Sequence, residues 1–104
     1  MANVVDLTDV NFGETIGSGI TLVDFWAPWC GPCMMQGSIV KKVADAVGEK
    51  ATVARMNVDE AQQSAAQYGI RSIPTLIIFK DGKAVQQFVG VQQENQLVAA
   101  IENA

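Results

Sequence analysis

Histidine is absent from this 104-residue sequence, and cysteine occurs only twice, as Cys30 and Cys33. Zinc sites in proteins normally have four ligands, drawn from cysteine, histidine and carboxylate side chains. A zinc site at these two cysteines would therefore need ligands from a second chain, and we expect no bound metal.

An excess of positive charge is also missing. The 7 lysine and arginine residues are outnumbered by 11 aspartate and glutamate residues, which gives a formal net charge of −4. Nucleic acids and anionic membranes attract basic surfaces. We therefore expect neither as a partner.

The sequence starts without the basic segment and long apolar core of a signal peptide, and no apolar run approaches the length of a membrane span. Repeats, low-complexity tracts and linkers are absent as well. Hydrophobic residues make up 49% of the chain and charged residues 17%, which is typical of a compact globular protein. We expect a cytoplasmic protein with one domain over residues 1–104.

Both cysteines lie in the segment Trp-Cys-Gly-Pro-Cys at residues 29–33, between an apolar run at residues 20–27 and a helical pattern at residues 34–47. The helical pattern has one apolar face, made of Met35, Ile39, Val40, Val43, Ala46 and Val47. The cysteine pair should therefore open a helix, where free N–H groups and the helix dipole favour an anion. Cys30, at the helix start, should ionise readily, and the thiolate is the nucleophilic form.

Two structural interpretations compete with redox chemistry at this pair. A structural disulfide stabilises a fold more when it closes a longer loop. The expected stabilisation is about 2 kcal/mol for a loop this short, against about 4.7 kcal/mol for a loop of 100 residues. Inert buried thiols fit poorly, because the Gly-Pro between the cysteines is typical of a turn. A Cys-x-x-Cys in a chain with alternating strands and helices favours a redox site.

Strands and helices alternate along most of the chain. Strands are predicted at residues 3–7, 20–27, 51–58, 75–79 and 84–89. Helices are predicted from residue 11 to Gly17, at residues 34–47, from residue 59 to Tyr68 and at residues 93–102, with Asn11 and Asp59 as N-caps of the two short ones.

Asp81-Gly82, between the last two strands, is a strong hairpin signal, so these strands should be antiparallel neighbours. The order βαβαβαββα indicates an α/β fold in which helices cover both faces of one mixed sheet. The cysteines would then lie at the carboxyl end of a central strand, where sites in such sheets tend to occur.

Five stretches of the sequence match a known family. They are VDFWAPWCGPC at residues 23–33, NVD at 57–59, YGIRSIPT at 68–75, FKDG at 79–82 and VG at 89–90. Over essentially its whole length the chain resembles the thioredoxins. The resemblance implies the thioredoxin fold, with a five-stranded sheet and four helices. It also implies a protein-disulfide reductase that cycles between a dithiol and a disulfide of Cys30 and Cys33.

The resemblance extends to partners. A flavin-dependent thioredoxin reductase would recharge the protein, which would pass electrons to target proteins with disulfides. The protein itself would hold no cofactor, because NADPH and FAD belong to the reductase. It would act as a monomer.

The two cysteines have different predicted roles. Cys30 lies at the turn and is the predicted nucleophile, whereas Cys33 lies one helical turn further in and is the predicted resolving cysteine. Gly31 and Pro32, between them, are expected to tune the thiol pKa, as is Arg55.

Asp24 interrupts the apolar run at residues 20–27. It is either a solvated residue on an uncovered face or a buried carboxyl, and burial of its neighbours favours the second. A carboxyl kept away from water has a raised pKa and can act as a base near neutral pH. The resemblance places it behind Cys33, where it would take part in acid–base chemistry.

An apolar groove beside the disulfide is expected to hold an extended substrate segment. Its predicted lining is Trp29, Ile73, Pro74, Gly90 and Val91. From the residues alone a trans bond before Pro74 is the commoner state, but the resemblance implies a cis bond. The Ile73 backbone could then pair with a target as in strand addition, and Gly90 would let another backbone approach.

Three features depart from the usual thioredoxin pattern. Met34 follows the second cysteine, where a basic residue is common, and Gly37-Ser38 takes the place of a helix-bending proline. Arg55 replaces the usual lysine, so its pairing with Asp24 is expected to be a fixed ion pair. We expect these changes to affect the choice of partners and the reduction potential, but not the type of reaction. We expect Met34 to be exposed and Met35 to pack in the core.

Two other functions stay open at this point. One is a binding module of the same fold in which the cysteines matter little, and the other is an oxidant that works outside the cytosol. The intact cysteine pair, Asp24 and Pro74 together favour the reductase over the binding module. A measurement of the reduction potential would distinguish an oxidant from a reductase.

Overall fold

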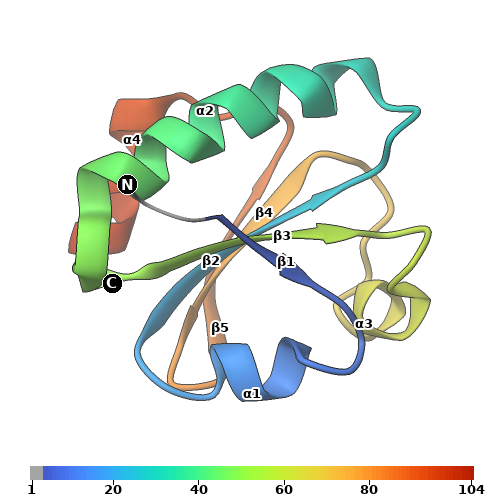
Figure 1. Cartoon of the computed structure of the whole chain (residues 1–104), viewed down its shortest axis with the longest axis horizontal. Coiled ribbons are helices and arrows are strands. Elements are labelled where there is room, and N and C mark those ends of the chain that lie inside the picture. Colours follow the sequence, from blue (N-terminus) through green and yellow to red (C-terminus); the bar gives the residue numbers. More distant parts are fainter. Residues whose placement is uncertain (1–3) are drawn as a thin grey trace.

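The computed structural model describes residues 4–104 (Figure 1). Its elements are β1 (Val4–Leu7), α1 (Phe12–Ile16), β2 (Ile20–Trp26), α2 (Gly31–Val47), the short 3-10 helix η1 (Gly48–Lys50), β3 (Thr52–Asn57), α3 (Gln62–Gln67), β4 (Thr75–Lys80), β5 (Lys83–Val89) and α4 (Glu94–Glu102). The order confirms the predicted alternation. The predicted first strand began at Asn3, which lies outside the described residues.

The five strands form one mixed sheet in the order β1-β3-β2-β4-β5. Strands β1, β3 and β2 are parallel, whereas β4 runs antiparallel to both β2 and β5. Strand β2 is therefore central, as expected for the strand that precedes the cysteines. The hairpin between β4 and β5 is also confirmed, and its turn residues Asp81 and Gly82 have φ values of +50° and +88°.

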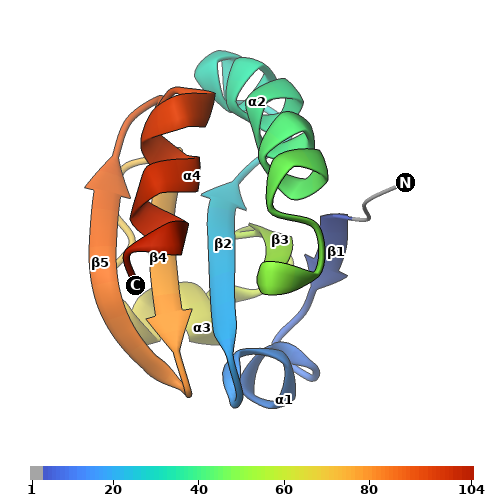
Figure 2. The same ribbon diagram turned by 90° about the vertical axis from the view of Figure 1, so that its left-hand side faces the viewer.

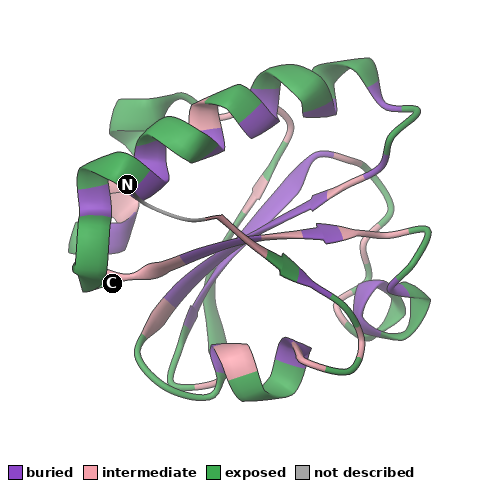
Figure 3. Ribbon diagram, viewed as in Figure 1, coloured by how far each residue is buried: buried purple, intermediate pink, exposed green. Residues whose placement is uncertain are grey.

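Helices cover both faces of the sheet, and each face has its own hydrophobic core. Helices α2 and α4 lie together on one face (Figure 2), where Val40, Val43 and Leu97 pack against Leu22 and other strand residues. Helices α1 and α3 lie on the opposite face. The burial pattern follows this arrangement, because the central strands are buried along most of their length and the outer sides of the helices are exposed (Figure 3).

The inner face of α2 differs from the predicted one. Met35 was expected to pack in the core, but its side chain is 61% exposed, and Ala46 is exposed as well. Gln36 is fully buried instead, on the same side of the helix as Val40 and Val47. An apolar side chain one position away from the buried face of a helix is turned by about 100°, and sequence periodicity alone did not resolve that difference.

The N-cap prediction is right for one of the two short helices. Asn11 is the N-cap residue of α1, although its side chain makes no capping hydrogen bond. The N-cap of α3 is Ala61 and not Asp59. The free N–H groups of α3 are instead satisfied from far along the chain by Asp9, whose carboxylate accepts hydrogen bonds from the Ser64 N–H at 2.8 Å and the Ser64 hydroxyl at 2.7 Å. These bonds hold the pKa of Asp9 below its usual value.

Over residues 4–104, none of the helices has both the length and the apolar character that crossing a bilayer requires.

Candidate active site

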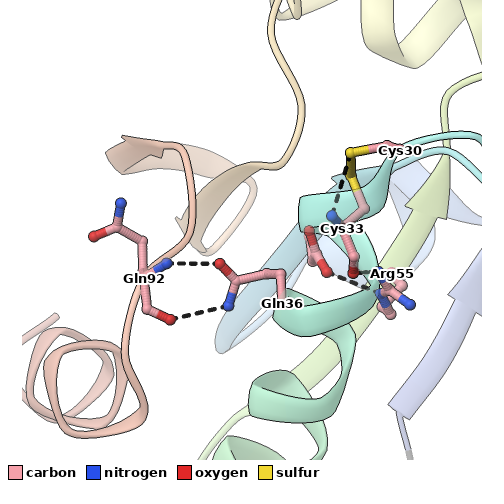
Figure 4. Close-up of polar contacts among 6 residues, drawn as sticks. Cys30, Cys33, Gln36, Arg55 and Gln92 are labelled. Atoms are coloured by element: carbon pink, nitrogen blue, oxygen red, sulfur yellow. Dashed lines mark hydrogen bonds and ion pairs between the residues drawn. A yellow bond between two sulfur atoms is a disulfide. The ribbon is translucent and has the colours of Figure 1, made fainter.

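Cys30 and Cys33 form a disulfide at the start of α2, beyond the carboxyl end of β2. Cys30 is the N-cap residue, and its Sγ accepts a hydrogen bond of 3.2 Å from the Cys33 N–H (Figure 4). Gly31 and Pro32 form the first turn, where proline is tolerated because its missing N–H would have no helical partner. The helix start thus directs an N–H group at the outer sulfur, which favours a thiolate there once the disulfide is reduced.

The two cysteine residues differ in exposure to solvent. Cys30 is 6% exposed and Cys33 is completely buried. Among the described residues, no cluster of three or more histidine, cysteine, aspartate or glutamate side chains could hold a metal ion.

Asp24 is a buried carboxyl in β2, the central strand that leads to the cysteines. Its Oδ2 accepts a hydrogen bond of 2.8 Å from Nε of Arg55, whose side chain is 16% exposed. Its Oδ1 is buried and has no hydrogen-bond partner among the described residues. Burial raises the pKa of Asp24 to about 6, although the charge and hydrogen bond of Arg55 oppose the increase.

Arg55 connects this carboxyl to the second cysteine. While Nε binds Asp24, Nη2 of the same guanidinium donates a 3.0 Å hydrogen bond to the carbonyl oxygen of Cys33. The guanidinium also lies 4.4 Å from the ring centre of Trp26, within cation–π distance. Its position is therefore set by three separate groups.

Gly37 provides the space that the guanidinium occupies. A Cβ atom at residue 37 would lie 2.7 Å from Nη1 of Arg55, closer than such atoms normally approach, and 3.0 Å from Cζ, so the guanidinium would have to shift. Two departures from the usual thioredoxin pattern are thus in direct contact. The arginine in place of lysine and the glycine at residue 37 are sterically matched.

Two of the predicted substrate residues, Ile73 and Pro74, lie in the loop beside Cys30, and Gly90 is bonded to that loop. The Ile73–Pro74 bond is cis, and the Ile73 carbonyl oxygen lies 3.8 Å from Sγ of Cys30. The Gly90 N–H donates a 2.8 Å hydrogen bond to the carbonyl of Pro74, so the segment that continues into Val91 lies against the same loop. Gly90 has a φ of +89°, which glycine adopts without strain, and the space beside its Cα is open.

Trp29 is 70% exposed next to the disulfide, and Met34 is also exposed, as expected. The Trp29 indole N–H donates a 2.9 Å hydrogen bond to Asp59. This bond holds the indole ring at the surface.

Sequence reasoning did not identify Asp59, Gln36 and Gln92 as parts of the site. Gln36 could have been noticed, because a polar residue stands at a core position of a helix whose other core positions are apolar. Nothing local in the sequence indicates the partners of Asp59 and Gln92.

The fold and this cysteine pair define a class of protein, the thiol–disulfide oxidoreductases, which alternate between a disulfide and a dithiol. The family model for thioredoxin matches residues 3–103. The chain belongs to the thioredoxin family, and like other thioredoxins it is a protein-disulfide oxidoreductase.

Individual relatives agree with this assignment. The chain is 50% identical to thioredoxin from Alicyclobacillus acidocaldarius, over 91% of each sequence, and 46% identical to thioredoxin from Staphylococcus saprophyticus, over 95% of each. Its structure is similar to the crystal structure of Malassezia sympodialis thioredoxin, with a TM-score of 0.90 and 35% identity. That similarity covers 99% of this chain and 91% of the other, which confirms the thioredoxin fold.

The contact between Gly37 and Arg55 gives a prediction about Asp24. Replacing Gly37 by alanine should displace the guanidinium, and the pKa of Asp24 should rise above about 6 because the opposing charge moves away. The pKa, measured from the carboxyl carbon resonance by NMR, is the appropriate readout. Stability is not, since alanine is favoured over glycine inside a helix by about 1 kcal/mol and would mask part of the loss.

The matched control is the same substitution in an Arg55→Lys background. The steric conflict involves the guanidinium, so Gly37→Ala should change the pKa of Asp24 much less there. An equal change in both backgrounds would contradict the steric matching of the two residues.

Proposed function

We propose that this thioredoxin reduces disulfides of target proteins by attack of Cys30, followed by release through Cys33. The proposal rests on the different environments of Cys30 and Cys33. Cys30 caps the helix, accepts the Cys33 N–H and is the more exposed residue, whereas Cys33 is completely buried. The hydrogen bond to its sulfur and its greater exposure favour Cys30 as the cysteine that attacks a target disulfide.

In the first step the Cys30 thiolate attacks one sulfur of the target disulfide. A mixed disulfide forms, and the other target sulfur leaves as a thiolate that takes a proton from solvent. In the second step the Cys33 thiolate attacks Cys30 Sγ and the first target sulfur leaves. The protein ends as the Cys30–Cys33 disulfide and the target as a dithiol, so two electrons have moved to the target.

Asp24 is the proposed base for the second step, because Cys33 is buried and must lose its proton without direct contact with water. A carboxyl with a pKa of about 6 is mostly ionised near neutral pH yet still able to accept a proton. Arg55, bound to both Asp24 and the Cys33 carbonyl, keeps the carboxyl and the second cysteine in a fixed relation.

Target recognition is proposed to use the surface around Cys30, formed by Trp29, Ile73, Pro74, Gly90 and Val91. Backbone groups of the loop beside the sulfur and an exposed tryptophan suit an extended polypeptide of varied sequence. The proximity of Ile73 to Cys30 and the open space beside Gly90 support this role.

The electron source is proposed to be a thioredoxin reductase, which would hold NADPH and FAD while this protein holds no cofactor of its own. We further propose that residues 1–104 form a single domain that works as a monomer in the cytoplasm. Family membership implies reductase and disulfide-containing partners in general.

Replacing Cys33 by serine should trap the mixed disulfide, because the second attack is removed. Cys33→Ser should accumulate covalent adducts with a target protein, detected by mass spectrometry under non-reducing conditions. Cys30→Ser is the matched control and should form none. Adducts in Cys30→Ser but not in Cys33→Ser would show that Cys33 is the nucleophile and Cys30 the resolving cysteine.

Asp24→Asn should slow turnover near neutral pH and stabilise the folded protein. A carboxyl whose pKa is about 6 when folded and about 3.9 when unfolded binds its proton more tightly in the folded state. Wild-type stability therefore falls, relative to the asparagine variant, as the pH rises from about 4 to about 6. This pH-dependent loss should approach about 3 kcal/mol between about pH 3 and about pH 7. Denaturant unfolding across this range tests the stability, and an unchanged turnover rate would limit Asp24 to a structural role.

Gly90→Asp should weaken reactivity toward a protein disulfide and toward the reductase by about tenfold, a loss of about 1.4 kcal/mol. Reactivity toward a small aromatic disulfide should change much less, because that reagent does not need the surrounding surface. Gly90→Asn is the control for backbone and bulk, since asparagine tolerates positive φ and adds no charge. Equal losses with all reagents would contradict the proposed recognition surface.

A further inference from the structure

Gln36 is a fully buried amide whose two ends are both hydrogen-bonded to one distant residue. Its Oε1 accepts a 2.7 Å hydrogen bond from the Gln92 N–H, and its Nε2 donates a 3.1 Å hydrogen bond to the Gln92 carbonyl (Figure 4). A reciprocal pair of this kind imitates one rung of a β-ladder and fixes both the separation and the orientation of the two segments.

The two ends of this contact belong to the two parts of the proposed site. Gln36 lies on α2 one turn beyond Cys33, and Gln92 lies two residues beyond Gly90. The Gln92 side chain also donates to the carbonyls of Val89, at 3.3 Å, and Gly90, at 3.1 Å. The segment from Val89 to Gln92 is therefore held together by its own hydrogen bonds and attached to the helix through Gln36.

Packing does not require glutamine at this position. The other buried residues of α2 beyond its first turn are glycine, alanine and valine, and a leucine would fill a similar volume without a polar group to satisfy. A buried amide is costly unless its hydrogen bonds are made, and here one partner residue makes a bond to each end. The chemistry of the side chain thus points to a role in fixing the position of residue 92.

We infer that Gln36 is a positioning residue that sets the segment of Gly90 and Val91 relative to the cysteines, so that a polypeptide on this segment presents its disulfide to Cys30. The inference rests on the proposed recognition surface. Gln36 contacts neither target nor sulfur in this account. It acts through the Gln92 backbone and, beyond it, through Gly90, whose N–H is already fixed to Pro74.

Gln36→Leu tests this role, with Gln96→Leu on the exposed side of α4 as the matched control. Single-turnover reactions of the reduced proteins would be followed with a protein disulfide such as insulin and with a small aromatic disulfide. Gln36→Leu should lower the rate constant for the protein disulfide about tenfold through weaker binding, while the rate at saturation and the small-disulfide rate change less than twofold. Gln96→Leu should change neither.

Amide hydrogen exchange gives a readout independent of activity. The Gln92 N–H should exchange faster in Gln36→Leu, while amides in the centre of β2 keep their protection. Gln36→Met, which is unbranched and of similar length, provides the same test should the leucine variant fold poorly. Unchanged exchange at Gln92 would overturn the inference, and so would equal losses with both disulfides.

The Gly90→Asp variant separates this inference from the function on which it rests. A selective loss in Gly90→Asp without one in Gln36→Leu would leave the recognition surface in place and overturn the role of Gln36. If Gly90→Asp showed no selective loss toward the protein disulfide, the proposed recognition surface would be contradicted, and so would the role of Gln36 that rests on it. Selective losses in both variants, with faster exchange at Gln92, are the expected result.

Discussion

The buried contact between Arg55 and Asp24 is the interaction on which the arrangement of the site depends. One guanidinium reaches a carboxyl on β2, a carbonyl at the start of α2 and the ring of Trp26. Two effects oppose each other at the carboxyl: removal from water favours its neutral form, and Arg55 favours its charged form. Burial is the larger effect and Arg55 only limits it, so the pKa is raised to about 6, where the group can change state near neutral pH.

Strand direction explains why segments distant in sequence meet at this one place. Strand β4 is antiparallel to both β2 and β5. The carboxyl ends of β2 and β5 therefore lie at the same end of the sheet as the start of β4. The cysteines follow β2, the segment of Gly90 follows β5, and the loop of Pro74 precedes β4. Asp24 and Arg55 are also direct neighbours in the register of β2 and β3, which brings the ion pair close to the same end of the sheet.

Much of this organisation could be predicted from local sequence patterns. Apolar runs located the strands, Asp81-Gly82 identified the hairpin, and the position of the cysteine pair between an apolar run and a helical pattern placed it at a helix start. The features that local patterns did not reveal are polar contacts between residues far apart in the chain. Gln36 and Gln92 are 56 residues apart, and Asp9 and Ser64 are 55 apart. Such pairs depend on how the elements pack, and neither member carries a sign of its partner.

The chain's departures from the usual thioredoxin pattern also act together. An arginine at residue 55 needs more space than a lysine, and Gly37 supplies it. In the proposed mechanism the Arg55 guanidinium is a fixed partner of the Asp24 carboxyl and not a proton route. A proton taken from Cys33 must then be held by Asp24, and its Oδ1 is the oxygen left without a partner among the described residues. In this proposed mechanism Arg55 orients the Asp24 carboxyl, and Asp24 is the group that accepts the proton.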